Sequence, residues 1–454
     1  MGDRLLVVGG DAAGMSAAAQ ARRRDDRLEI VVMEKGRWTS YSACGIPYLV
    51  AGTVHGLDDL IARTPEEFRS ARIDVRTGHE VTGVDLVGRK AEVRDHARGR
   101  TFKLGFDMLH IATGAVPRRS EIPGTDLAHV HGVQTLGDAA WLLDDVAGRR
   151  PRNVVVAGSG YVGLELAEAF VERGASVTVV EAEPEVMGSL DPDMGAIVAR
   201  AMRQAGITVR VGERVESISD RLVHTPEAEL AADLVVLGLG VVPDSCLAAT
   251  AGIETGVDGA VVVDRQQRTS APGVWAAGDC CQSTHLVSGL PVHVALGTTA
   301  NKQGRVAGIN LSGGYATFPG VLGTAVTRIC DVEIGRTGLS EREAAAAGFA
   351  PVVSRIEATT TAGYMPGASR ITVKLVSEAG GGRILGVQIV GGRGSAKRVD
   401  VVAAALLGRL TLEDVVQLDM GYAPPFSSVW DPVQVAARQS LGKAPLGPNR
   451  QTSR

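Results

Sequence analysis

Two copies of a strand, glycine turn and helix constrain the fold of this chain more than any other feature. The first turn, residues 9–14, reads GGDAAG after an apolar strand at residues 4–8. The second turn, residues 158–163, reads GSGYVG after an apolar strand at residues 153–157. Glycines at such turns let the backbone N–H groups of the helix N-terminus approach a pyrophosphate. The chain is therefore predicted to contain two Rossmann-like dinucleotide-binding units.

A carboxylate ends the second strand of each unit, where it can hold a ribose hydroxyl. Glu34 has this position in the first unit and Glu181 in the second. The second glycine pattern is complete, whereas Asp11 replaces a usual glycine in the first, so a turn without a ligand stays an alternative there. Residues 181–184 read EAEP, without the arginine that would receive a 2′-phosphate, which favours NADH over NADPH without excluding dual use.

Further strand ends support this organisation. Residues 109–114 (LHIATG) and 234–240 (LVVLGLG) lie at matching places after the two units. Asp279 ends the strand pattern at residues 273–279, where a carboxylate can hydrogen-bond a polyol or merely cap a turn. Residues 321–339 and 370–391 alternate apolar and polar side chains, which predicts antiparallel strands in a third, α+β domain.

Cys44 stands alone in SYSACGIPY, residues 40–48. A redox pair with four intervening residues would need a second cysteine at position 49, and that residue is Leu49. The partner of Cys44 would therefore be the sulfur of a small thiol, in a mixed disulfide, or the oxygen of a sulfenic acid.

The other four cysteines form no C-x-x-C pair, so neither a metal site nor a disulfide framework is expected. We expect Cys246, Cys280, Cys281 and Cys330 to be small buried apolar side chains. The net charge of −4 disfavours a nucleic acid or an anionic membrane surface as partner. Because the chain enters a strand at once and has no apolar run of transmembrane length, a cytoplasmic location is expected.

Together these motifs resemble the pyridine nucleotide–disulfide oxidoreductases, flavoproteins with two dinucleotide sites, over nearly the whole chain. The lone cysteine in S-x-x-x-C-G-x-P-Y resembles their coenzyme A disulfide reductase, NADH oxidase and NADH peroxidase branch. The resemblance implies an α/β fold with two Rossmann-like domains, for FAD and NAD(P)H, and a C-terminal α+β dimerisation domain. The implied boundaries are an FAD domain at 1–112 and 244–318, an NAD(P)H domain at 113–243, a dimerisation domain at 319–442 and a flexible tail at 443–454.

The resemblance also implies which residues contact the two cofactors, FAD and NADH. These are Gly9, Gly10, Ala13, Gly14, Glu34, Lys35, Thr113, Gly114, Gly158, Gly160, Tyr161, Gly163, Glu181, Gly240, Gly278, Asp279 and Ala295. Peroxidases of this branch carry a histidine in the first glycine turn, and the aligned residue is Ala12, which disfavours a peroxidase.

The catalytic residues implied by the resemblance are Cys44, Tyr364 and Tyr422, with both tyrosines supplied by the partner subunit of a homodimer. The His-Glu proton donor of other reductases is absent, since the last histidine is His293. The implied coenzyme A contacts are Ser16, Gln20, Arg23, Ser40 and Arg72. Interface packing stays an alternative for each tyrosine, and a solvated helix-end charge stays one for Arg23.

The expected activity is hydride transfer from NAD(P)H through FAD to Cys44, which reduces coenzyme A disulfide or a related mixed disulfide or persulfide. The thiolate is the working form, so a lowered pKa of Cys44 is expected. One alternative is an NAD(P)H oxidase in which Cys44 cycles through a sulfenic acid. Another is an electron-transfer reductase for an iron–sulfur or rubredoxin-like protein, which would tolerate Cys44→Ser.

Overall fold

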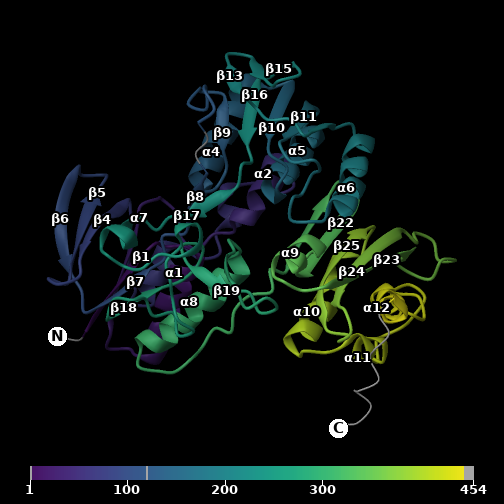
Figure 1. Ribbon diagram of the computed structural model, residues 1–454. Coiled ribbons are helices and arrows are strands. Elements are labelled where there is room, and N and C mark those ends of the chain that lie inside the picture. The colour runs from purple at the N-terminus through teal and green to yellow at the C-terminus, as the bar shows by residue number, and fades with distance from the viewer. Residues whose placement is uncertain (1–2, 119–120, 444–454) are drawn as a thin grey trace, which may run out of the picture.

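Five parallel strands form the first of three five-stranded sheets in the computed structural model, which describes residues 3–118 and 121–443. The strand order is β18-β7-β1-β2-β3. The sheet is built from β1 (Arg4–Val8), β2 (Glu29–Glu34), β3 (Asp74–Thr77), β7 (Met108–Ile111) and β18 (Val274–Ala276). We call this sheet and the elements packed on it the first lobe (Figure 1).

The two faces of the first sheet are apolar because alternate residues of each strand point to opposite sides. Leu5 and Val7 face helices α1 (Ala12–Arg24) and α8 (Gly297–Leu311), and Leu6 and Val8 face the opposite cluster. The two helices pack with backbones almost touching, since a Cβ on Gly304 of α8 would lie 2.3 Å from the Ala13 carbonyl oxygen. Helix α1 is the helix expected after the first glycine turn.

An antiparallel meander and several short elements complete the first lobe. The meander covers the sheet face opposite α1. These elements are β4 (His79–Asp85), β5 (Lys90–Asp95), β6 (Arg100–Gly105), η1 (Ala43–Gly45), η2 (Leu57–Leu60), α3 (Pro65–Ser70), α7 (Cys246–Thr250), η3 (Val257–Gly259), β19 (Gln282–Thr284) and β20 (Pro291–His293).

The second lobe repeats the parallel architecture, with strand order β12-β11-β10-β16-β9. Its strands are β9 (Val130–Gly132), β10 (Asn153–Ala157), β11 (Ser176–Glu181), β12 (Thr208–Val211) and β16 (Leu234–Leu237). Its other elements are α4 (Leu136–Arg149), α5 (Tyr161–Glu172), α6 (Pro192–Gln204), β13 (Ser217–Ser219), β14 (Leu222–His224) and β15 (Glu229–Ala231). The chain enters and leaves this lobe through an antiparallel pair, β8 (Ala115–Pro117) and β17 (Val241–Pro243).

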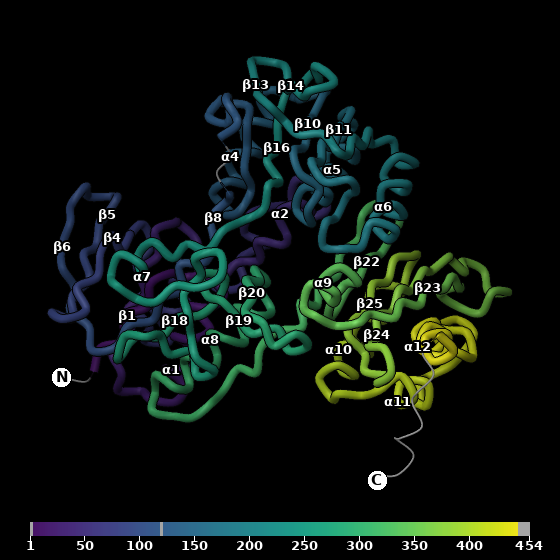
Figure 2. The backbone as a smooth tube through the Cα atoms, viewed as in Figure 1, coloured from purple at the N-terminus to yellow at the C-terminus, as the bar shows by residue number. Residues whose placement is uncertain are grey.

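The helix that follows Cys44 packs on the second lobe, although its neighbours in sequence belong to the first. This helix, α2 (Ile46–Ala51), buries Ile46, Leu49 and Val50 in the same cluster as Leu164 of α5. Arg173, after α5, donates a 2.8 Å hydrogen bond from Nη1 to the Val50 carbonyl oxygen. The tube view shows α2 lying between the two lobes (Figure 2).

The third lobe is an antiparallel sheet with order β21-β22-β25-β24-β23, and helices lie on it (Figure 1). Its strands are β21 (Ala325–Ile329), β22 (Val332–Gly338), β23 (Pro351–Thr359), β24 (Arg370–Glu378) and β25 (Ile384–Gly391). Its helices are α9 (Glu341–Ala346), η4 (Ala396–Arg398), α10 (Val399–Leu407), α11 (Leu412–Val416) and α12 (Pro432–Lys443). The predicted antiparallel strands and the predicted fold class are thus confirmed.

The tail predicted at 443–454 begins one residue too early, because Lys443 is the last residue of α12. The remaining tail residues lie outside the described residues. Among the residues that are described, no helix is both long and apolar enough to cross a lipid bilayer.

A buried lysine joins the second lobe to the third. Lys374 on β24 is only 5% exposed, and its Nζ lies 3.2 Å from Asp191, 2.7 Å from Asp193 and 2.9 Å from Glu341. Asp191 precedes α6 and also accepts a 2.6 Å hydrogen bond from Gln388 on β25. Burial acts to lower the pKa of Lys374, but the hydrogen bonds to Asp193 and Glu341 prevail and raise it.

We expect Lys374→Met to lower the free energy of unfolding by roughly 3–5 kcal/mol, because it leaves the buried Asp191 carboxylate without its charge partner. Chemical denaturation at one fixed protein concentration measures this. Lys397→Met is the matched control: Lys397 pairs with Asp400 but is 75% exposed, so a loss below about 1 kcal/mol is expected. Equal losses for the two variants would contradict the assignment of the buried ion pair.

Candidate functional site

The first glycine turn is packed against backbone on two sides. Gly9 has a φ of +107°, and a Cβ there would lie 2.0 Å from the Ala112 carbonyl oxygen at the end of β7. A Cβ on Gly14 would lie 1.9 Å from the Gly9 carbonyl oxygen. Glu34 accepts hydrogen bonds from the backbone of Gly10, at 2.7 Å, and of Gly36, at 2.6 Å. The turn is therefore closed against the sheet and lies beside the predicted ribose carboxylate.

Two buried polar atoms flank this turn without a hydrogen-bond partner among the described residues. They are Oδ1 of Asp279 and Oγ1 of Thr39. Burial raises the pKa of Asp279, and the only effect opposing it is the charge of His293. Gly278 places Asp279 at the turn, since a Cβ on Gly278 would lie 2.8 Å from the Ala13 Cβ. Orphaned buried oxygens of this kind fit a ligand that carries hydroxyl groups.

The other residues predicted around the first turn lie at its border. Thr113 donates a hydrogen bond from Oγ1 to the Asp244 carbonyl oxygen, and Lys35 Nζ lies 3.4 Å from the Asp244 carboxylate. Gly114 has a φ of +76°. Ala295 follows β20, whose His293 Nε2 lies 2.8 Å from the Asp279 carbonyl oxygen.

Asp11, the residue that departs from the glycine pattern, ties this turn to the cysteine segment. It lies just before α1, and its Oδ1 accepts a 3.1 Å hydrogen bond from the Tyr41 backbone N–H. Next to it, the Ser40 N–H donates to the Gly10 carbonyl oxygen at 3.0 Å. Burial, with smaller contributions from Glu34 and Asp279, raises the pKa of Asp11 to about 6. The sequence marks Asp11 as a departure but does not predict this contact.

Asp11→Asn is expected to stabilise the protein at high pH. The raised pKa means that the protonated carboxyl stabilises the fold below about pH 4, and that this contribution is lost as the pH rises through about 6. Asparagine keeps the acceptor for Tyr41 without the charge, so the gain should approach about 3 kcal/mol at pH 8 and about zero at pH 4. Urea unfolding at the two pH values checks this. The control is Asp220→Asn at an exposed position, where a stability change within about 0.5 kcal/mol is expected.

Cys44 lies in η1, immediately before α2, and its side chain is exposed and free of any disulfide. The segment is fixed on the other side by the Ser42 N–H, which donates to the Leu60 carbonyl oxygen at 2.8 Å. A Cβ on Gly45 would lie 2.2 Å from a Leu60 methyl carbon, so the turn beside the sulfur has no room for a side chain. The Cys44 side chain therefore lies at the surface, while the backbone turn that carries it is closely packed.

The protein's own groups do not supply the expected lowering of the Cys44 pKa, and a lowering by bound flavin stays a prediction. Partial burial, followed by the charge of Glu165 and those of Asp279 and Asp11, raises the pKa of the Cys44 thiol. Glu165 of α5 is itself half-buried and accepts a 2.5 Å hydrogen bond from Thr327 Oγ1 of β21. A role for Glu165 was not predicted from the sequence. The one feature that could have pointed to it is a carboxylate among the inward-facing residues of the helix that follows GSGYVG.

The second glycine turn combines tight packing with one open face. A Cβ on Gly158 would lie 2.4 Å from the Gly238 carbonyl oxygen, and one on Gly163 would lie 2.4 Å from the Gly158 carbonyl oxygen. A Cβ on Gly160 would meet nothing within 4 Å. The open side at Gly160 is where a pyrophosphate would approach the backbone.

Glu181 lies beside this turn and is held in place by it. Its carboxylate accepts hydrogen bonds from the Ser159 N–H at 2.8 Å, the Ser159 hydroxyl at 2.5 Å and the Glu183 N–H at 2.9 Å. Tyr161 opens α5 and accepts a 3.5 Å hydrogen bond from Ser189, and burial raises the pKa of its hydroxyl. Gly240, predicted at the border of the site, has a φ of +82°.

The predicted coenzyme A contacts lie in three places. Ser16, Gln20 and Arg23 follow helical spacing along one side of α1, and Arg23 Nη2 donates to Gln20 Oε1 at 2.8 Å. Ser40, with a φ of +48°, adjoins the first glycine turn. Arg72 is exposed, and its carbonyl oxygen accepts a 2.8 Å hydrogen bond from Arg22. The structure thus brings the helix residues together and keeps Arg72 at the far end of α1.

Tyr364 and Tyr422 lie on neighbouring loops of the third lobe and are 75% and 48% exposed. Desolvation raises the pKa of Tyr422, as do the charge of Tyr364 and a side-chain hydrogen bond to it. Within residues 3–118 and 121–443, no hydrogen bond or ion pair connects either tyrosine loop to the Cys44 segment. Their predicted pairing with a cysteine of a second subunit therefore stays a prediction.

The remaining cysteines divide between core and surface. Cys280 and Cys281 are buried and free, with their sulfur atoms 3.7 Å apart, which confirms their expected burial. Cys330 is only half-buried, in the turn between β21 and β22. The expectation is wrong for Cys246, which is exposed because it opens the short helix α7 on its outer side, while Ala248 points inward.

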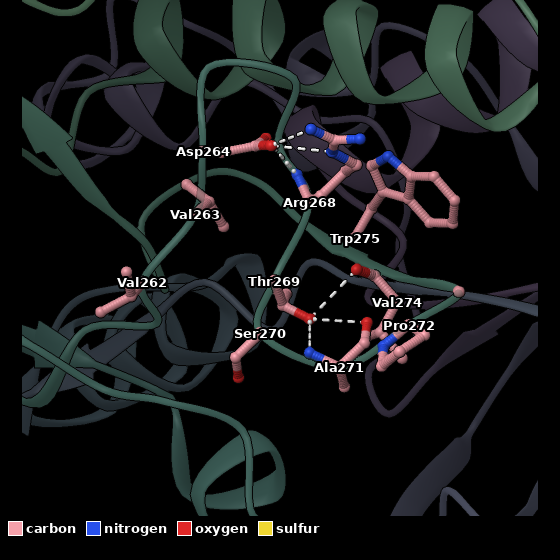
Figure 3. A pocket seen from close by; sticks show the side chains of 11 residues that line it. Val262, Val263, Asp264, Arg268, Thr269, Ser270, Ala271, Pro272, Val274 and Trp275 are labelled. Atoms are coloured by element: carbon pink, nitrogen blue, oxygen red, sulfur yellow. Dashed lines mark hydrogen bonds and ion pairs between the residues drawn. The ribbon is translucent and has the colours of Figure 1, made fainter.

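A cavity of about 440 Å³ lies elsewhere on the first lobe (Figure 3). It is lined by residues 262–264 and 268–275, and none of the predicted site residues is among them. Arg268 pairs with Asp264 at 2.7 Å, and Thr269 hydrogen-bonds the backbone of its own loop, as Figure 3 shows. The Ser270 hydroxyl accepts a 2.9 Å hydrogen bond from the Glu254 N–H, and the buried Trp275 Nε1 has no hydrogen-bond partner among the described residues.

Comparisons with known proteins match this arrangement. The family model described as pyridine nucleotide-disulphide oxidoreductase matches residues 3–304, and that of the family's dimerisation domain matches residues 324–433. An NAD(P)H sulfur oxidoreductase (CoA-dependent) of Pyrococcus abyssi is 38% identical over 440 residues, 96% of this chain and 97% of the relative. An NADH oxidase of Methanocaldococcus jannaschii is 36% identical over 446 residues, 97% of this chain and 99% of the relative.

The solved structures agree with the sequence matches. The structure of an NAD-dependent persulfide reductase from A. fulgidus has a TM-score of 0.94 and 35% identity to this chain. The match covers 97% of this chain and 83% of that one. All three lobes therefore have counterparts in a solved structure.

Proposed function

Because the chain belongs to the pyridine nucleotide–disulphide oxidoreductase family, we propose that it uses NAD(P)H to reduce coenzyme A disulfide or a related mixed disulfide or persulfide of coenzyme A. The observation that carries this proposal is Cys44, an exposed free cysteine whose segment is held against the first glycine turn through Asp11 and Tyr41. The relative from P. abyssi, whose name includes CoA dependence, supports coenzyme A as the thiol.

The residues around the first glycine turn fit FAD. Asp279 and Thr39 offer buried oxygens to a polyol, the turn offers backbone N–H groups, and Glu34 lies where a ribose would be held. Bound FAD would accept a hydride from the nicotinamide and pass two electrons on to a disulfide. The open face at Gly160 and the fixed carboxylate of Glu181 fit NADH, and Glu181 would disfavour the 2′-phosphate of NADPH.

In the proposed reaction Cys44 is the nucleophile. Its thiolate attacks one sulfur of coenzyme A disulfide, so that a Cys44–S–S–CoA bond forms, the substrate S–S bond breaks and one coenzyme A thiolate leaves. Two electrons from NAD(P)H then split the mixed disulfide and release the second coenzyme A. Partial burial and the charges of Glu165, Asp279 and Asp11 raise the pKa of Cys44 in the protein alone, so these groups favour the protonated thiol over the attacking thiolate.

The third lobe would complete the site from a second subunit. The chain carries the family's dimerisation domain, and Tyr364, Tyr422, Phe426, Val429 and Trp430 leave an exposed aromatic and apolar surface there. Across a homodimer interface the two tyrosine hydroxyls would orient or protonate the leaving thiolate.

An NAD(P)H oxidase that reduces oxygen is the second candidate, favoured by the relative named NADH oxidase. In that function Cys44 would cycle through a sulfenic acid instead of a mixed disulfide. An electron-transfer reductase for an iron–sulfur or rubredoxin-like partner would need no cysteine at this place.

Anaerobic titration with NADH, followed spectrally and combined with mass analysis of Cys44, separates these functions. Uptake of one two-electron equivalent beyond the flavin, with release of coenzyme A, is the result we expect. Uptake without a released thiol would replace the reductase by the oxidase. Reduction of the flavin alone would make Cys44 a bystander and favour electron transfer to a protein partner.

A further inference from the structure

We propose that Arg398 is a positioning residue that sets the relative placement of Tyr364 and Tyr422; the inference rests on the proposed function, in which these tyrosines act on the leaving thiolate. Arg398 ends η4, and its side chain is only 10% exposed. It touches neither glycine turn and lies wholly within the third lobe. Its hydrogen bonds reach both tyrosine loops, and through these loops it would act on the reaction.

The guanidinium of Arg398 connects the two loops directly. Its Nη2 donates to the Thr360 carbonyl oxygen at 2.7 Å, where the loop that carries Tyr364 begins. The same Nη2 donates to the Phe426 carbonyl oxygen at 3.0 Å, at the end of the loop that carries Tyr422. One nitrogen thus holds the backbone of both tyrosine loops.

The remaining nitrogens of Arg398 fix the guanidinium itself. Nε donates to Asp431 Oδ2 at 2.9 Å, and Nη1 donates to the Gly394 carbonyl oxygen at 2.6 Å. Asp431 is 8% exposed and also accepts hydrogen bonds from the Ser427 hydroxyl and the Val433 N–H. The plane of the guanidinium is therefore determined by contacts on three sides, so the loops it holds have one relative position.

Two further contacts link the loops within the described residues: the Ala362 N–H donates to the Pro424 carbonyl oxygen at 3.0 Å, and a side-chain hydrogen bond joins Tyr364 and Tyr422. The tyrosine rings are exposed and so gain little placement from packing within one subunit. Their positions follow from the loop backbones, which Arg398 holds. Lysine at position 398 cannot make these hydrogen bonds together, because its ammonium is a compact point charge and lacks the planar set of donors of a guanidinium.

The inference predicts a selective defect in Arg398→Lys. A misplacement of about 1 Å at a reacting group can lower the rate roughly 100-fold, so we expect kcat for coenzyme A disulfide to fall by roughly 10- to 100-fold, as in Tyr422→Phe. Anaerobic reduction of the bound flavin by NADH should stay within about twofold of the unsubstituted protein. Arg393→Lys, an exposed arginine on the same segment, is the matched control and should change neither rate.

A double-mutant cycle separates positioning from general support. If Arg398 acts through Tyr422, the variant carrying both Arg398→Lys and Tyr422→Phe should be no slower than the slower single variant. Multiplying defects, or an equal loss of flavin reduction and of the dimer, would overturn the inference. If Arg398→Lys does not fold, Asp431→Asn, which removes the charge that orients the guanidinium, must give the same selective defect.

The same variants distinguish a failure of the role of Arg398 from a failure of the proposed function on which it rests. Full activity of Arg398→Lys beside an impaired Tyr422→Phe would overturn only the role of Arg398. Full activity of both Tyr364→Phe and Tyr422→Phe would overturn the proposed role of the tyrosines, and with it the inference.

Discussion

Cys44→Ser is expected to abolish NADH-dependent reduction of coenzyme A disulfide, with a loss of roughly 1,000-fold or more. Serine has nearly the same size, so the η1 turn and its contact with Leu60 are kept, but a hydroxyl oxygen cannot form the mixed disulfide. The FAD content and the rate of flavin reduction by NADH should be unchanged, because among the described residues no hydrogen bond joins the Cys44 side chain to either glycine turn. Disulfide reduction, followed by thiol release, measures the effect.

The matched control for this prediction is Cys246→Ser, since Cys246 is also exposed and free but lies on α7. Its activity should stay within about twofold. If Cys44→Ser kept its disulfide reductase activity, the nucleophile would have to be another group. If it kept only electron transfer to a protein acceptor, the third function considered above would become the better one.

Gly14→Ala is expected to weaken FAD binding by roughly 10- to 100-fold, which corresponds to the 1–3 kcal/mol of an overpacked site. The added Cβ would lie 1.9 Å from the Gly9 carbonyl oxygen and 3.0 Å from its carbonyl carbon. Both are backbone atoms of the turn itself, so the strain cannot be relieved by a side chain. Moving them would displace the N–H groups that we propose face the pyrophosphate of FAD.

Titration of the flavin-free protein with FAD, followed by the quenching of flavin fluorescence, measures this loss. Gly148→Ala is the matched control, because Gly148 lies in α4 and an added Cβ there would meet nothing within 4 Å. We expect unchanged FAD affinity and a slight gain in stability, as alanine is the better helix former. Unchanged affinity in Gly14→Ala would show that the turn can shift without cost to the ligand.

The glycine turns were predictable because their requirement is local. The spacing of Gly9 and Gly14 predicts a tight turn, and the small residues after it predict the helix α1. Glu34 and Glu181 were predictable as well, because each stands where the second strand of its unit ends. The antiparallel strands of the third lobe were predictable for the same reason, since alternation along one strand is visible in the chain.

The contacts that depend on how distant segments meet were not predictable. Glu165 raises the pKa of Cys44 only because α2 packs on α5, and Lys374 meets Asp191 only because β24 meets the start of α6. Cys246 was expected to be buried because cysteine is usually a buried residue type. The residue type alone does not tell which side of α7 the side chain occupies. Arg398 has no motif of its own, and its importance comes from the loops that it joins.

The packing of α2 on α5 has a consequence for anyone who redesigns the nicotinamide preference of this enzyme. The helix behind Cys44 rests on the core of the second lobe, through Val50 and Arg173. Exchanging the whole segment 113–243 with that of a relative would therefore also replace the apolar core on which α2, the helix after Cys44, packs. Single substitutions beside Glu181 would leave this packing intact and are therefore the better way to alter the nicotinamide preference.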